Sequence, residues 1–139
     1  MMAPIGRHQD AAVQRRFSVV PGSWGIVRLA ADLPLPAWLE RDAGFVSITR
    51  TPDELSIVCA EAAVPPDAVA ERGWAMLRVE GPLPFAEIGV VSSFASALAA
   101  AGISLFTIST FDTDYILVKA GRLADACAAL AAAGHQRAA

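Results

Sequence analysis

Apolar and polar residues follow the most regular pattern in the second half of the chain. Residues 74–80 form a short apolar run that ends at the Gly-Pro-Leu-Pro sequence of 81–84, which predicts a strand and then a break. From 86 to 101, apolar residues recur every three or four positions, which predicts a helix that ends at Gly102. The expected buried stripe of this helix consists of Ile88, Val91, Ala95, Leu98 and Ala99.

Two strands and a second helix follow in the same half. Residues 103–108 and 113–119 have strand patterns, and the short polar stretch between them predicts a hairpin-like connection. A final helix is expected over 122–133, with Gly134 after its last turn. Its expected inner stripe consists of Leu123, Cys127 and Leu130. The order of elements in this half is therefore βαββα.

The first half gives a weaker version of the same order. A turn at Pro21-Gly22 separates its first two strands, and 34–42 have room for only a short helix. The expected strands are 17–20, 24–29, 45–50 and 54–59. Pro65-Pro66 then marks a linker. The hairpin sequences 50–58 and 109–118 are alike, which favours a repeated unit.

This alternation of strands and helices predicts an α+β fold, with helices on one face of a mainly antiparallel sheet. The predicted organisation is a flexible N-terminal tail at 1–16, a first and shortened unit at 17–66 and a second unit at 67–139.

Composition narrows the possible classes of protein. Of the 139 residues, 55% are hydrophobic and 18% are charged, which is typical of a compact globule. The net charge of −3 gives no support for nucleic-acid binding. No apolar run reaches the roughly 18 residues of a membrane span, and the first 16 residues lack the apolar core of a signal peptide. We therefore expect a cytoplasmic location, with Cys59 and Cys127 as free thiols.

The sequence contains no recognisable set of catalytic or metal-binding residues. His8 and His135 have no cysteine or carboxylate at metal-ligand spacing, so both are expected on the surface. Asp112 and Asp114 could form a carboxylate pair, but a hairpin turn explains them better. We expect no enzymatic activity, no metal and no cofactor. The three tryptophans are expected in a core or interface, and a ligand-stacking role for one stays open. They are Trp24, Trp38 and Trp74.

Residues 102–118 read Gly-Ile-Ser-Leu-Phe-Thr-Ile-Ser-Thr-Phe-Asp-Thr-Asp-Tyr-Ile-Leu-Val. This stretch resembles the second and third strands of an ACT domain, of the type found in aspartate kinase regulatory domains and CASTOR arginine sensors. Shorter pieces between 36 and 83 are also similar to tandem ACT proteins, so the resemblance spans 17–135. It implies two ferredoxin-like βαββαβ units, amino-acid binding and side-by-side pairing of ACT units, for example in a dimer. It does not imply catalysis.

The resemblance also implies where a ligand lies: against the strand-to-helix loop 84–90 and the start of the next strand. Helix-start N–H groups can bind a carboxylate, and a strand edge offers free backbone groups. Carboxylates of Glu87 and of the hairpin could bind an ammonium group. The expected ligand-binding residues are Pro84, Glu87, Ile88, Gly89, Val90, Ser104, Leu105, Asp112, Thr113 and Asp114. The alternative for Glu87 and Ser104 is that they are ordinary exposed residues.

Two functions are compatible with these features. The first is a regulatory module that binds a free amino acid and acts, by a conformational or interfacial change, as a homo-oligomer or on a protein partner. The second is a structural ACT pair with a degenerate pocket that serves only in protein association. Neither involves nucleic acid or membrane.

Overall fold

The computed structural model describes residues 14–41, 44–84 and 87–138. His8, most of the expected tail and the expected helix start at Ala86 lie outside these residues. The chain divides into two compact units. Pro21–Ala75 form the inserted unit, and Met1–Val20 with Met76–Ala139 form the split unit. The residues of each unit contact one another more than they contact the other unit. The expected boundary between units 17–66 and 67–139 stays a prediction.

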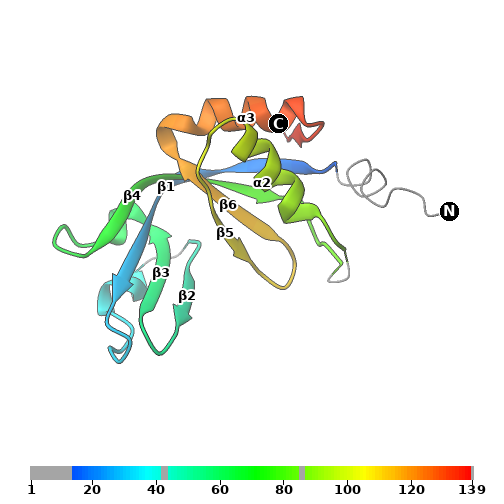
Figure 1. The fold of residues 1–139 in the computed structure, drawn as a ribbon. Helices are drawn as coiled ribbons and strands as arrows, with labels where there is room; N and C mark the ends of the chain where they lie inside the picture. Colours follow the sequence, from blue (N-terminus) through cyan, green and yellow to red (C-terminus); the bar gives the residue numbers. More distant parts are fainter. Residues whose placement is uncertain (1–13, 42–43, 85–86, 139) are drawn as a thin grey trace. The chain divides into compact units, whose positions relative to one another are not determined.

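The inserted unit is a sheet whose longer connections contain short 3₁₀ helices (Figure 1). Strand β3 (Leu55–Ala60) lies between β2 (Ser47–Arg50) and β1 (Arg16–Leu29) and is antiparallel to both. Strand β4 (Ala70–Val79) hydrogen-bonds to β1 on its other side. The short helix expected over 34–42 is a 3₁₀ helix, η1 (Ala37–Arg41), and a second one, η2 (Glu61–Ala63), follows β3.

Strand β1 is continuous where the sequence predicts a turn at Pro21-Gly22. Gly22 has φ of 121°, a conformation that other residues rarely adopt, so the backbone can pass Pro21 without leaving the strand. Arg16, expected in the tail, is the first residue of this strand.

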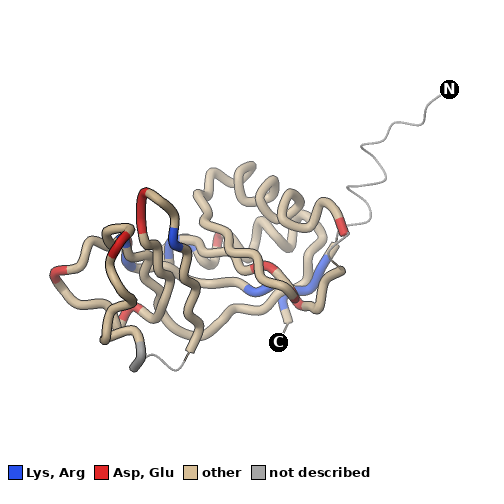
Figure 2. Tube along the Cα trace, turned by 90° about the horizontal axis from the view of Figure 1, so that it is seen from below, with Lys and Arg blue, Asp and Glu red and all other residues tan. Residues whose placement is uncertain are grey.

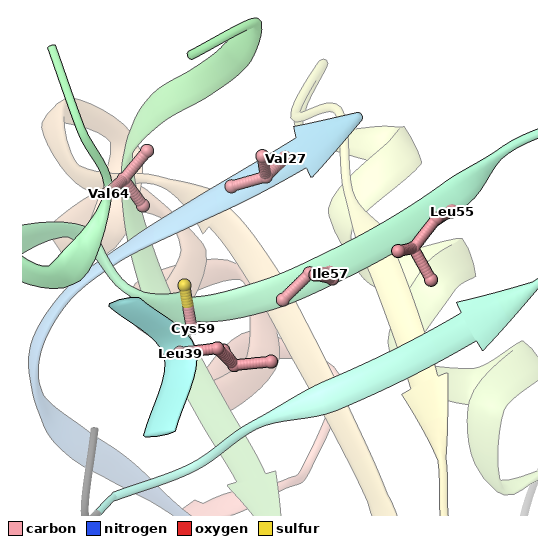
Figure 3. Close-up of a cluster of buried hydrophobic side chains, with 6 residues drawn as sticks. All are labelled: Val27, Leu39, Leu55, Ile57, Cys59 and Val64. Carbon is pink, nitrogen blue, oxygen red and sulfur yellow. The ribbon is translucent and has the colours of Figure 1, made fainter. Parts of the chain in front are cut away.

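The inserted unit has its own hydrophobic core (Figure 3). Leu55, Ile57 and Cys59 alternate along β3 and point to one face, as the two-residue period of a strand requires. Leu39 of η1 covers them, and Trp38 packs at the margin. Val27 and Val64 complete the cluster.

Among its described residues, the split unit combines strands with two α-helices. Strand β6 (Asp114–Lys119) lies between β4 and β5 (Phe106–Ser109), and β5 and β6 are antiparallel. Strand β7 (Gln136–Arg137) runs parallel to the start of β1. Helices α2 (Val90–Ala100) and α3 (Leu123–Ala132) pack against each other, and α3 also packs on β6 (Figure 1). The expected hairpin at 109–112 is confirmed.

The buried face of α2 differs from the expected stripe. Val90, Phe94 and Leu98 are buried at a spacing of four residues, while Val91 and Ala95 are only half-buried. Ile88 precedes the helix and is 62% exposed. Leu98 is buried as expected, whereas Ala99 is exposed. The other two buried positions, Val90 and Phe94, each precede an expected position by one residue. In α3 the buried residues are Ala126 and Leu130, and Cys127 is half-buried.

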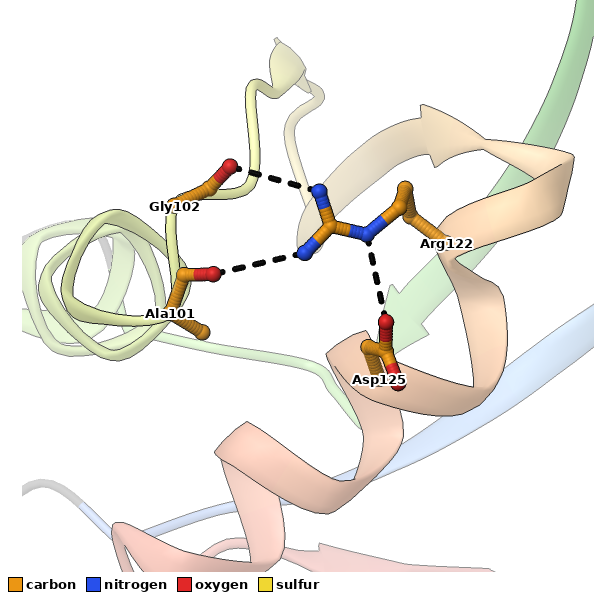
Figure 4. A network of polar contacts seen from close by, with 4 residues as sticks. All are labelled: Ala101, Gly102, Arg122 and Asp125. Carbon is orange, nitrogen blue, oxygen red and sulfur yellow. Dashed lines mark hydrogen bonds and ion pairs between the residues drawn. The ribbon is translucent and has the colours of Figure 1, made fainter.

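Arg122 joins the end of α2 to the start of α3 (Figure 4). Its guanidinium donates to the carbonyl oxygens of Ala101 at 3.3 Å and Gly102 at 3.4 Å, and its Nε to Asp125 at 3.2 Å. A cation is favourable at the C-terminal end of a helix, where carbonyl groups lack helical partners. This contact links the end of α2 to the start of α3 at the surface.

Charged residues are spread along the described chain and are separated by long uncharged stretches (Figure 2). The two adjacent arginines at the start of β1 form ion pairs, Arg15 with Glu87 and Arg16 with Glu80. Among the described residues, no helix is both long enough and apolar enough to cross a membrane.

Candidate functional site

The split unit contains a cleft of about 310 Å³ between the start of α2 and the β5–β6 hairpin. Its walls come from the segment before α2, the first turn of α2 and the hairpin turn. The lining residues are Leu83, Pro84, Glu87, Gly89, Val90, Val91, Ser92, Ser109, Thr110, Phe111, Asp112, Thr113 and Asp114.

Gly89 determines where α2 begins. It is the N-cap residue with φ of 84° and ψ of 0°, in the left-handed region that favours glycine. Its carbonyl accepts the N–H of Ser93 at 2.9 Å, which is the first helical hydrogen bond. No side chain caps this end of the helix. Val90, Val91 and Ser92 of the first turn line the cleft, and N–H groups at a helix start suit a negatively charged group.

The hairpin turn forms the opposite wall and is held by its own hydrogen bonds. Thr110 N–H donates to the Thr113 carbonyl at 2.8 Å, and Thr113 N–H donates to Thr110 Oγ1 at 3.2 Å. The Thr113 side chain is buried and donates to the Val79 carbonyl at 2.6 Å. Ser109 Oγ donates to Asp114 Oδ1 at 2.6 Å. The carboxylates of Asp112 and Asp114 are thus presented by a firmly anchored turn.

Gly81 allows the segment before α2 to approach the hairpin. A Cβ atom at this position would lie 3.0 Å from the Asp112 carbonyl oxygen and 3.1 Å from Thr113 Cβ. The same carbonyl accepts the N–H of Leu83 at 2.6 Å. Leu83 and Asp112, which this hydrogen bond joins, both line the cleft.

Glu87 connects the cleft to the beginning of the chain. Its carboxylate forms an ion pair with the guanidinium of Arg15, and its N–H donates to the Pro84 carbonyl at 3.0 Å. Glu87 lies before α2, whereas the helix expected over 86–101 would place it in the first turn. The Glu87 carboxylate is therefore paired with Arg15, and the residue also lines the cleft.

His135 is buried, whereas the sequence predicted a surface residue. Its side chain is 2% exposed, and its ring stacks on Phe94 with centroids 4.0 Å apart. Nδ1 accepts the backbone N–H of Arg15 at 3.0 Å, and Nε2 lies 2.9 Å from Ser93 Oγ. The neutral imidazole fits both contacts, with its proton on Nε2.

Burial lowers the pKa of His135 from its ordinary value of 6.5. Above pH 6.5 the ring is neutral in both the folded and the unfolded chain, so no protonation cost reduces the stability of the folded chain. Below 6.5 the unfolded chain binds a proton first, and stability is lost as the pH falls towards and through the lowered pKa.

We therefore expect the melting temperature to fall between about pH 7.5 and about pH 5.5. His135→Gln should flatten this dependence, whereas His8→Gln should leave it unchanged. Thermal unfolding of the three proteins across this range measures the effect. An equal pH dependence in wild type and His135→Gln would contradict it.

The structure brings together most of the residues expected to bind a ligand. Those that line the cleft are Pro84, Glu87, Gly89, Val90, Asp112, Thr113 and Asp114. Ile88, Ser104 and Leu105 do not line it. Ser104 and Leu105 lie in the connection before β5, which begins at Phe106 and not at the expected residue 103. Ligand binding by any of these residues stays a prediction.

Several other expectations concern residues outside the cleft. Trp24 and Trp74 are buried and Trp38 is half-buried, so the expected core role is confirmed. Trp24 also lines a second cavity, of about 490 Å³, in the inserted unit. Cys59 and Cys127 are free thiols, as expected. Within the residues that the structure describes, no cluster of histidine, cysteine and carboxylate groups could hold a metal ion.

Comparison with known families gives a match to the ACT domain family over the part of the chain that forms this cleft. The ACT domain family matches residues 69–132, which include α2, β5 and β6. A second family, described as an N-terminal domain, matches residues 22–67.

Solved structures share the fold of this chain. A crystal structure of a protein from Agobacterium tumefaciens is 43% identical, covers 90% of this chain and 92% of its own, and superposes with a TM-score of 0.83. The chain belongs to the same family as this protein. The regulatory subunit of aspartate kinase from Thermus thermophilus has the same fold, with a TM-score of 0.61 at 15% identity over 84% of this chain and 96% of its own.

A curated relative matches a shorter segment. The human protein called cytosolic arginine sensor for mTORC1 subunit 1 is 52% identical over 46 residues, or 32% of this chain. The match spans 14% of the length of that protein.

Proposed function

We propose that the protein is a regulatory module that senses a free α-amino acid by binding it in the cleft between α2 and the β5–β6 hairpin. The observation that carries this proposal is the pairing of opposite chemistry across one cleft. Uncapped N–H groups at the start of α2 suit a carboxylate, and Asp112 and Asp114 on the other wall suit an ammonium group.

The comparisons support the same class of ligand. The relatives include a regulatory subunit of aspartate kinase and a protein named an arginine sensor. We propose that the chain contains two ACT units in tandem and acts in the cytoplasm, either as a dimer or on a protein partner. These units convert ligand binding into a signal. The output of such a module is a conformational or interfacial change.

A thermal-shift screen with each of the twenty amino acids tests the proposal. A ligand that binds only the folded chain stabilises it by about 2.7 kcal/mol at a hundredfold excess over Kd. We expect at least one amino acid to raise the melting temperature. No shift with any of them would overturn the proposal and favour a purely structural ACT pair.

Ser92→Asp tests whether the cleft is the site. Ser92 is exposed in the first turn of α2 and lines the cleft. An aspartate there suits the helix dipole, worth about 0.3–1 kcal/mol, but repels a ligand carboxylate. We expect the variant to stay folded and lose the thermal shift. Ser96→Asp, on an exposed position of the same helix outside the cleft, is the matched control and should keep it.

A further inference from the structure

We propose that His135 is a positioning residue for the cleft: its neutral ring holds Arg15, and Arg15 holds Glu87 in the geometry that binds ligand. Protonation of His135 then weakens ligand binding at a cleft that it does not line. This inference rests on the proposed function of the cleft and adds a regulatory input to it.

The first step is the fixed position of the His135 ring. Its backbone N–H donates to the Leu130 carbonyl of α3 at 3.0 Å, which anchors the residue just after that helix. Phe94 stacks on the ring and also meets Phe17 edge to face, with centroids 6.1 Å apart. Since Phe17 and Phe94 are fully buried, the ring has little freedom to move when its protonation changes.

The second step is the direction of its two hydrogen bonds. Nδ1 can accept the Arg15 N–H only while it carries no proton, so protonation would place two donors against each other. Burial of the resulting charge adds a further cost. Through Nε2 the ring also contacts Ser93, which follows the cleft-lining first turn of α2. A protonated ring must therefore push away the backbone of Arg15.

The third step links Arg15 to the cleft. The same residue whose N–H binds His135 pairs through its guanidinium with Glu87, a lining residue. The charged groups connected to His135 in this way are Arg15 and, through it, Glu87. Ser93 and Phe94 from α2 and the Leu130 carbonyl from α3 carry no net charge. A displaced Arg15 leaves the carboxylate of Glu87 unpaired and changes both the shape and the charge of the cleft.

An NMR titration of the full-length protein tests the link without any ligand. We expect the chemical shifts of the Arg15 amide and of the Glu87 side-chain carboxyl to change in a step at the pH midpoint of the His135 ring titration. In Arg15→Ala the ring should still titrate, but the step at Glu87 should disappear. A wild-type Glu87 signal that shows no step at this midpoint would overturn the proposal, as would a step that survives in Arg15→Ala.

Binding measurements at two pH values complete the test. The probes are the twenty free amino acids, each titrated at about pH 7.5 and below the His135 midpoint. We expect the affinity of any that binds to fall by about tenfold or more at the lower pH, because the competent state is less populated. In His135→Gln, which cannot titrate, the affinity should not change with pH. If no amino acid binds but the Glu87 carboxyl signal still changes at the His135 midpoint, the proposed function is wrong and the link between His135 and Glu87 is supported. If wild-type affinity is independent of pH, the regulatory role of His135 is wrong.

Discussion

Leu98→Ala is expected to lower the free energy of unfolding by about 2–5 kcal/mol, because the side chain is removed from a packed interior. Leu98 is 0% exposed and belongs to the buried face of α2. Its carbonyl also accepts the N–H of Ile103, so the residue lies where the helix turns towards β5. Chemical denaturation measures the loss.

Ser96→Ala on the same helix is the control. Ser96 is exposed, and we expect a change of no more than about 0.5 kcal/mol. Ser93→Ala is expected to cost about 0.5–1.5 kcal/mol because it removes the hydroxyl beside His135. Equal denaturation midpoints for Leu98→Ala and Ser96→Ala would contradict the assigned helix face.

The second large effect is expected in the inserted unit. Ile57→Ala should cost about 2–5 kcal/mol, because Ile57 is 0% exposed in the core formed by β3 and η1. Ile48 is its direct partner on β2 and is 43% exposed, so Ile48→Ala is a matched control with the same change of side chain. We expect the control to lose much less stability in the same denaturation experiment. Equal losses would show that the buried face of β3 has been assigned wrongly.

Local sequence patterns predicted the β5–β6 hairpin well because its stability is itself local. Apolar residues alternate in β5 and form a continuous run in β6, and Thr110 and Thr113 satisfy each other's backbone groups within the turn. The Asp112 and Asp114 carboxylates are part of this turn, so their place on the cleft followed from a correct hairpin.

The start of α2 was harder to predict. Alanine is frequent from Ala86 to Ala101, so several faces of a helix carry apolar residues and the period alone does not choose between them. The left-handed conformation of Gly89 decides where the helix begins. Because glycine tolerates many conformations, the sequence does not reveal which one it adopts.

The burial of His135 depends on contacts between distant parts of the chain. Arg15 is 120 residues away in sequence, and Ser93 is 42 residues away. No local pattern reports such partners. The position of His135 directly after Gly134 at the end of α3 was the one available signal, since chains often turn back onto the fold after a helix.

The central claim is that the cleft binds a free α-amino acid, and mapping of backbone amide shifts by NMR tests it most directly. The full-length protein is titrated with each of the twenty amino acids in turn. The account predicts saturable shifts concentrated at the start of α2 and in the hairpin turn, among Gly89, Ser92, Asp112 and Asp114. Saturable shifts confined to the inserted unit, or no saturable shift with any amino acid, would contradict it.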